Sequence, residues 1–71
     1  MPLSMLDVGE LREIKDLRGN EEAKRHLKDL GFVRGEQVKV LQENGSGLIL
    51  LVKNVRIAMS RAMASKIIVT D

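Results

Sequence analysis

The chain has 71 residues, with twelve basic and ten acidic side chains, a net charge of +2 and no cysteine. Disulfide bonds and thiolate zinc sites are therefore excluded, and no apolar run approaches the ~20 residues of a membrane-spanning helix. A chain of this size buries only about 60% of its unfolded surface, so we expect a single domain over residues 1–71 with a thin core.

The N-terminal residues lack the charged start and the long apolar stretch of a signal peptide. Together with the absence of cysteine, this favours a reducing, cytoplasmic location. Basic residues are spread over the whole chain, and Phe32 is the only aromatic residue. Because nucleic-acid binders gather their cations on one face and single-strand binders stack bases on aromatic rings, we expect no nucleic-acid partner.

Residues 1–10 have the character of a lead-in, with a turn at Gly9. The segment 11–17 is ambiguous. Its apolar residues are spaced by three, as in a helix, but Gly9 and Gly19 leave only the length of a strand between them. We predict a strand here.

The segment 20–30 has the clearest helical pattern. Asn20 suits the N-cap, and the two glutamates that follow it place negative charge in the first turn. Gly31 follows the last apolar position, where a C-cap with positive φ favours glycine. The apolar stripe of this helix consists of Ala23, Leu27 and Leu30.

Gly31 and Gly35 bracket a tight corner between this helix and a series of short strands. Ser60 is placed to cap a helical turn at 61–64. One helix among five short strands favours a mainly β fold, and a closed or nearly closed small β-barrel would hide the edges of its sheet. The predicted strands after the corner are 36–43, 48–52, 55–59 and 66–70.

The strand 48–52 is apolar on both faces, so its register decides which face is buried. With Lys53-Asn54 as a two-residue turn, Val52 lies opposite Val55. The inward residues are then Leu48, Leu50, Val52, Val55, Ile57 and Met59, and the outward residues are Ile49, Leu51 and Ala58.

In the preceding strand, 36–43, Val38 and Val40 must point to this same inward face. Pairing Val40 with Leu50 requires an odd number of residues between the two strands. We therefore predict a connection of three or five residues after Glu43, or a bulge at Gly45 or Gly47.

Few residues have the chemistry of a catalytic or metal site. His26 is the only histidine and lies four residues from Glu22, a spacing that chelates a metal weakly, so we interpret it as an exposed polar residue. Met59 and Met63 are more typical of core filling than of metal binding. The loop 44–47 lacks the lysine of a P-loop, and no serine has a base at a convincing spacing. We predict no enzymatic activity, no cofactor and no metal site.

The outward pair Ile49 and Leu51 is left over once the core is assigned. Either the helix or the lead-in covers this pair, or a protein partner does. In the second case the partner-binding residues are Ile49 and Leu51 as apolar anchors, Leu41 beside them and Arg56 as a rim charge. The same face could instead join two copies of the chain as a weak homo-oligomer.

The order of these motifs resembles the FeoA family, small bacterial proteins of ferrous iron transport. The resemblance runs from about Leu6 to Val69. The corner position that the family usually fills with proline is Arg34 here. The residues that carry the resemblance are Gly9 and Ile14, the helix end 25–31, the Leu-Gly-hydrophobic-x-x-Gly-x-x-Val corner at 30–38, and the closing segments 55–59, Ala64 and 67–69.

The resemblance implies a small SH3-like β-barrel with one helix inserted after the first strand. It also implies a cytosolic accessory or regulatory protein that binds FeoB, the membrane iron transporter with a cytosolic GTPase domain, and that meets the membrane only through this transporter. The family has no established catalytic residues. The alternative is a free-standing metal-responsive module that binds a transition metal ion or a regulator, since similar domains form the C-terminal part of iron- and manganese-dependent repressors.

Overall fold

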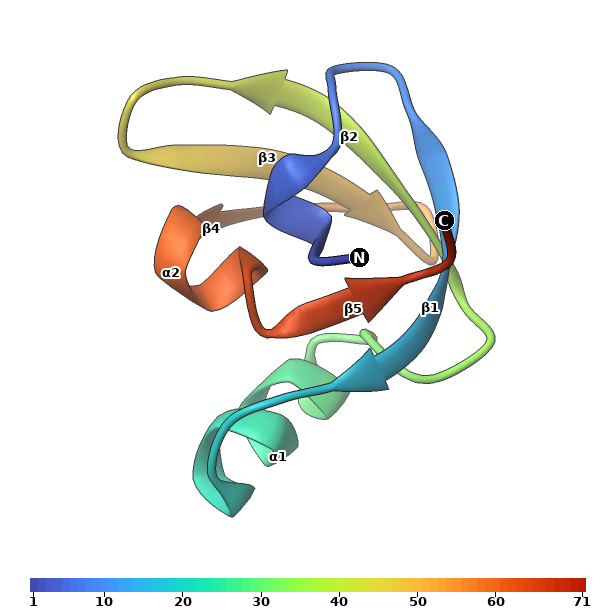
Figure 1. Ribbon diagram of the computed structural model, residues 1–71, viewed down its shortest axis with the longest axis vertical. Helices are drawn as coiled ribbons and strands as arrows, with labels where there is room; N and C mark the ends of the chain where they lie inside the picture. Colours follow the sequence, from blue (N-terminus) through green and yellow to red (C-terminus); the bar gives the residue numbers. More distant parts are fainter.

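The computed structural model describes residues 1–71 (Figure 1). Five strands form one antiparallel sheet with the order β4-β3-β2-β1-β5. The mainly β fold with one inserted helix is therefore confirmed. In chain order the elements are a 3-10 helix η1 (Leu3–Met5), β1 (Leu11–Leu17), α1 (Glu21–Asp29), β2 (Gln37–Glu43), β3 (Gly47–Val52), β4 (Val55–Ser60), α2 (Arg61–Ala64) and β5 (Ile67–Val69).

The sheet is strongly curved but does not close. Its two edge strands, β4 and β5, are not hydrogen-bonded to each other, and the chain passes from one to the other through the single turn of α2 (Figure 1). The predicted small barrel is therefore confirmed in the loose sense of a strongly curved sheet that stays open at one seam. A crossing helical turn separates strands that would have to be adjacent to exchange backbone hydrogen bonds.

One cluster of fourteen buried side chains fills the concave side of the sheet. It takes residues from every strand except β4, and from both α-helices, η1 and the corner after α1. Val55 was predicted to point inward, but it is 54% exposed, and Ile57 and Met59 are only partly buried. The reason is that β4 is an edge strand with no further strand beside it.

The unusual spacing in β1 has a structural cause. Ile14 and Leu17 are both buried although they are three residues apart. The pairing between β1 and β5 shifts between Ile14 and Asp16, so Lys15 is an extra residue in the ladder. This bulge turns the strand so that inward positions lie three apart, which is why the sequence pattern resembled a helix.

The register between β2 and β3 is the predicted one, since Val40 lies opposite Leu50. The last pair before the loop is Glu43 with Leu48, which leaves four residues between them, so a bulge and not an odd loop length produces the predicted register. The predicted position of a bulge was wrong, however. The register shifts within β2 at Leu41, and beyond it Gln42 lies opposite Ile49.

Local signals fixed the ends of several elements. Asn20 caps α1 by accepting a hydrogen bond from the N–H of Ala23 at 2.8 Å, and Ser60 caps α2 through the N–H of Met63 at 3.1 Å. Lys53 and Asn54 both have positive φ, 50° and 65°, as the two central residues of a type I′ hairpin turn require. Val52 therefore lies opposite Val55, as predicted.

The lead-in is part of the fold. Leu3 and Leu6 belong to the core, and Pro2 bridges to Ile68 on the free side of β5. The Met1 ammonium lies 3.2 Å from Oδ1 of Asp71. The hydrogen bond from this ammonium lowers the pKa of the Asp71 carboxyl. The lead-in therefore covers one edge of the sheet and packs on its inner side.

Gly31 ends α1 with φ of +109°. Its N–H bonds to the carbonyl of Lys28, and the next N–H, of Phe32, bonds to the carbonyl of Leu27. A Cβ at Gly31 would lie 3.5 Å from Cδ of Lys53, which is ordinary contact. Any cost of a side chain here comes from the backbone conformation rather than from a collision.

We expect Gly31→Ala to lower the free energy of unfolding by at least about 1 kcal/mol, because alanine is penalised at positive φ. Urea denaturation followed by circular dichroism measures this change. Gly45→Ala is the matched control, since Gly45 has ordinary φ and open space around its Cα, and it should stay within about 0.5 kcal/mol of the parent. Equal stability of the Gly31→Ala protein and the parent would contradict the prediction.

Candidate functional site

The convex side of the sheet carries a continuous row of side chains across four strands. Leu11 lies opposite Lys39, Lys39 opposite Leu51, and Leu51 opposite Arg56. Residues directly opposite each other on neighbouring strands share a face of the sheet. The pairing therefore brings together Leu51 and Arg56, two of the four predicted partner-binding residues.

Ile49 lies in the next row, opposite Ala58 on one side and Gln42 on the other. The bulge leaves Leu41 and Gln42 together opposite Ile49, so all four predicted residues gather on one side of the sheet. We call this surface the outer face. It consists of Leu11, Lys39, Leu41, Ile49, Leu51, Arg56 and Ala58.

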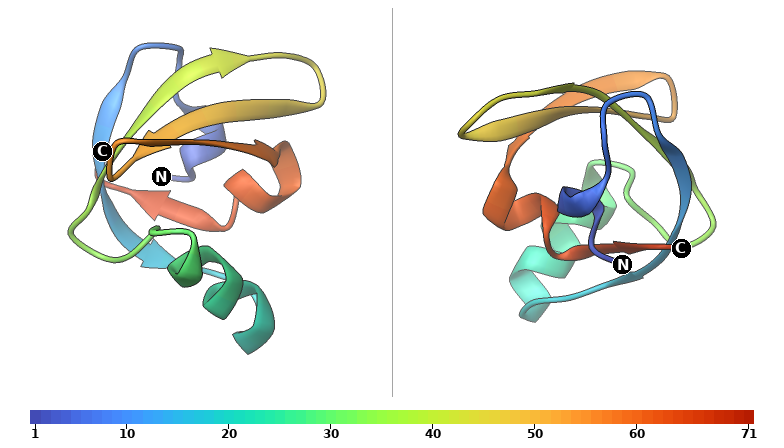
Figure 2. Two further views of the ribbon diagram at one scale, coloured as in Figure 1. Left: turned by 180° about the vertical axis from the view of Figure 1, so that it is seen from behind. Right: turned by 45° about the horizontal axis from the view of Figure 1, so that its top comes forward.

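The helices place their core residues on the side of the sheet away from the outer face. The residues of η1 and α1 that pack on the sheet, Leu3 and Leu27, belong to the core on the concave side. In the right-hand view of Figure 2, β2, β3 and β4 run along the top of the molecule, and η1, α1 and α2 all lie below them. The alternative that the helix covers this face is therefore wrong, and the lead-in places its own leucines, Leu3 and Leu6, in the core.

The outer face combines an apolar centre with positive charge. Leu41, Ile49 and Leu51 are partly exposed, and Arg56 is exposed. Neither Lys39 nor Arg56 forms an ion pair. A partner with apolar side chains and at least one carboxylate would match this arrangement.

Leu11 is an outer-face residue that the sequence argument missed. It is 52% exposed, although leucines in a strand usually face the core. Its spacing of three from Ile14 made it look like part of one stripe. In a regular strand an odd spacing places two residues on opposite faces, but Leu17 lies at the same spacing on the other side of Ile14 and is buried, so the spacing alone did not identify Leu11.

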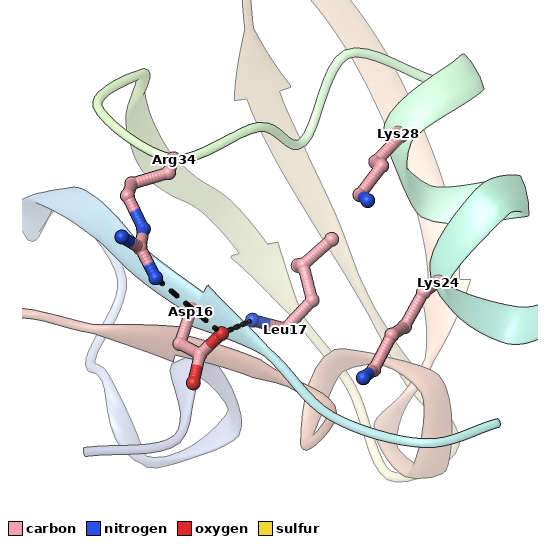
Figure 3. A pocket seen from close by; sticks show the side chains of 5 residues that line it. All are labelled: Asp16, Leu17, Lys24, Lys28 and Arg34. Carbon is pink, nitrogen blue, oxygen red and sulfur yellow. Dashed lines mark hydrogen bonds and ion pairs between the residues drawn. The ribbon is translucent and has the colours of Figure 1, made fainter. Parts of the chain in front are cut away.

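A cavity of about 300 Å³ lies between α1 and β1. Figure 3 shows Lys24 and Lys28 reaching towards Leu17 from α1, and Arg34 reaching towards Asp16 from the corner. Oδ1 of Asp16 accepts a hydrogen bond from the N–H of Leu17 at 2.8 Å and lies 4.0 Å from a guanidinium nitrogen of Arg34. Three cations and one carboxylate make this cavity positive.

The residues considered as metal ligands come closer together than the sequence indicated. Glu22 and His26 of α1 line a cavity of about 460 Å³ together with Met63 of α2 and Asn20. No group of three His, Cys, Asp or Glu side chains gathers anywhere in the chain. The cavity therefore offers one imidazole, one carboxylate and one thioether.

Three of the four serine hydroxyls take part in local turns or caps. Oγ of Ser60 caps α2, Ser46 donates to Oδ1 of Asn44, and Ser65 donates to the carbonyl of Ala62. Asn44 also accepts from the N–H of Gly47 and so organises the loop between β2 and β3. None of the helices has the length and apolarity needed to span a membrane.

Comparison with known families matches the FeoA domain to residues 1–71. The chain belongs to the FeoA family. This family is linked to ferrous iron transport, and the match extends over the corner and closing segments on which the resemblance rested. No curated protein matches the chain significantly.

Solved structures of other FeoA proteins have the same fold. An iron uptake regulatory protein (FeoA) is 27% identical, with a TM-score of 0.91, over 97% of this chain and 93% of its own. FeoA of Chlorobium tepidum is 31% identical, with a TM-score of 0.88, over 97% of this chain and 68% of its own. FeoA of Stenotrophomonas maltophilia, solved with zinc and described as a prokaryotic SH3 domain protein, is 30% identical, with a TM-score of 0.77, over 99% and 89%.

A manganese-dependent transcriptional repressor shares the fold at 12% identity, with a TM-score of 0.90, over 99% of this chain and 35% of its own. The SH3-like fold is therefore confirmed, and the likeness to the repressor concerns the fold alone.

We expect no tight ferrous site in the isolated protein. One imidazole, one carboxylate and one thioether do not complete the coordination shell of a transition metal ion. Anaerobic titration calorimetry with ferrous ion, on the parent and on His26→Ala, tests this expectation. A stoichiometric site with sub-micromolar affinity in the parent that disappears in His26→Ala would contradict it.

Proposed function

We propose that this FeoA-family protein is a non-catalytic interaction module that binds the cytosolic domain of the ferrous iron transporter FeoB. In this proposal residues 1–71 act as one cytoplasmic domain, and contact with the membrane is only through the transporter. Membership of a family linked to ferrous iron transport supports the pathway. The uncovered outer face supports binding as the mode of action.

The observation that carries the proposal is the apolar centre of the outer face. Ile49 and Leu51 are adjacent outward positions of a central strand, and both side chains are partly exposed. Interface energy usually concentrates in a few apolar or arginine side chains with polar surroundings. Strands also hold such side chains more rigidly than loops do, which lowers the entropy lost on binding.

The role of each residue follows from its place on this face. Ile49 and Leu51 supply the buried apolar contact, and Leu41 extends it along the bulged strand β2. Arg56, opposite Leu51 on β4, supplies a charge at the edge of the patch. Such a rim charge mainly affects the association rate and its salt dependence.

A metal-responsive module is the second candidate function. The cavity shared by Glu22, His26 and Met63 favours it, because these residues offer transition-metal ligands from two helices. Its ligand set supports weak and reversible binding at most. The calorimetric titration described above separates this candidate from the first.

We expect the double substitution Ile49→Glu, Leu51→Glu to weaken binding of the FeoB cytosolic domain by at least about tenfold, because two carboxylates replace the apolar contact. Pull-down followed by titration of the purified domain measures this. Both positions lie outside the core cluster, so amide NMR spectra should show a folded protein.

The matched control is Met5→Glu, Val8→Glu, which adds the same charge at exposed apolar residues of the lead-in, 67% and 56% exposed. It should bind like the parent. Sedimentation of all three proteins reports whether the outer face instead joins two copies. Undiminished binding by the folded outer-face variant would remove this face from the proposal.

A further inference from the structure

One edge strand of the sheet, β5, is covered by the lead-in, whereas the other, β4, is free. On the free side of β5, Pro2 bridges to Ile68, and Met1 and Val69 exchange hydrogen bonds at 2.8 and 2.9 Å. The lead-in therefore covers this edge. No segment of the chain covers the free side of β4, which ends the sheet on the other side.

The register shows which backbone groups β4 leaves free. In a two-residue hairpin the pair next to the turn, Val52 and Val55, is hydrogen-bonded, and every second pair after it is too, so Leu50 bonds to Ile57. Arg56 and Ala58 then direct their N–H and C=O groups away from β3. No hydrogen bond outside the regular elements engages these groups.

The bonding of β2 supports this assignment. The N–H and C=O of Val40 bond towards the segment before β1, to Glu10 and Gly9, at 3.2 and 2.8 Å. Its neighbour Lys39 must therefore bond on the other side, towards Leu51 of β3. Leu50 is then free to bond to β4, which leaves the alternate positions of β4 unpaired.

Apart from the charge of Arg56, the edge of β4 lacks the usual protection against strand addition. Its sequence has no proline, and its pairing with β3 is regular over six residue pairs without a bulge. Val55 is 54% exposed on the inner side, beside the partly buried Ile57 and Met59. An additional strand would cover all three side chains.

We propose that the free edge of β4 accepts an extended segment of the protein partner, which adds a strand to the sheet through the backbone groups of Arg56 and Ala58. This inference rests on the proposed function and specifies how the partner binds. The added strand continues the outer face beyond β4, so one segment contacts both the edge and the apolar patch. This is recognition by β-strand addition.

Charge defines the chemistry of the added segment. Arg56 is the only charged side chain on β4, and the nearest charge in the same row of the outer face is Lys39. The matching segment carries an acidic side chain opposite Arg56 and apolar side chains towards Val55 and Ile57. A second copy of the chain fits less well, because it brings another Arg56 to the same edge and no carboxylate on β4 to pair with it.

Amide hydrogen exchange tests the proposal without any substitution. In the free protein the amides of Arg56 and Ala58 should exchange fast, whereas that of Ile57, bonded to β3, is protected. Addition of the FeoB cytosolic domain should slow exchange at Arg56 and Ala58 by at least about tenfold and leave Ile57 little changed.

Two substitutions at one position separate the lost hydrogen bond from the added bulk. Ala58→Pro removes the free N–H, and proline is tolerated on an edge strand when its nitrogen faces away from the neighbouring strand. Ala58→Val adds similar bulk and keeps the N–H. We expect Ala58→Pro to bind the domain at least about tenfold more weakly than Ala58→Val.

A second comparison tests the charge. Arg56→Glu should weaken binding and reduce its salt dependence, whereas Arg25→Glu makes the same charge change on α1, at an exposed residue far from β4 in the fold, and should bind like the parent.

The exchange and binding experiments have four outcomes that would contradict the proposal. Strand addition is overturned if the parent binds the domain while the amides of Arg56 and Ala58 stay unprotected. It is also overturned if the Ala58→Pro and Ala58→Val variants bind with equal affinity. In both cases the proposed function remains. Protection of these amides in concentrated protein alone assigns the edge to a second copy and also overturns the proposal. A domain that does not bind the parent at all removes the proposed function, and this inference with it.

Discussion

The pairing of Val40 with Leu50 determines which of two apolar surfaces of β3 becomes the core. A slip of one residue would bury Ile49 and Leu51 and expose Leu48, Leu50 and Val52, at almost no change in apolar content. In the observed register Leu48, Leu50 and Val52 are at most 2% exposed, and Ile49 and Leu51 point outward. The tight turn at Lys53 and Asn54 and the two inward valines of β2 both enforce this choice. Every functional argument about the outer face depends on it, because that face exists only in this register.

The small core then has to be closed from its ends and edges. The lead-in, α1 and α2 each contribute one or two side chains to the concave side, and together they close what the open sheet leaves exposed. Because these segments pack on the concave side, the apolar side chains of the convex side stay partly exposed. The bare edge of β4 borders this face at Arg56 and Ala58. The two uncovered features are therefore parts of one continuous surface.

The separation of the two faces also separates stability from binding. Core side chains lie on the concave side, and the outer-face residues lie on the opposite side of the same sheet. Substitutions on the outer face can therefore change recognition without opening a cavity, whereas a change at Phe32 or Leu50, both fully buried, would remove part of a thin core. The same fold occurs in a metal-dependent repressor at low identity, which illustrates that the SH3-like scaffold leaves its function to the surface residues.

The sequence by itself determined the features that depend on neighbouring residues. Asn20, Gly31 and Ser60 fix helix ends through hydrogen bonds or dihedral angles within one turn, and Asn54 fixes a hairpin in the same way. Only the tertiary structure decided what depends on distant strands. The bulges at Lys15 and Leu41 arise because a strand between two neighbours must satisfy both registers. The exposure of Val55 follows from its place on an edge strand. The shared cavity of His26 and Met63 follows from the packing of two helices that are far apart in the chain. No local pattern encodes these features, because each is set by pairing or packing between segments separated by many residues.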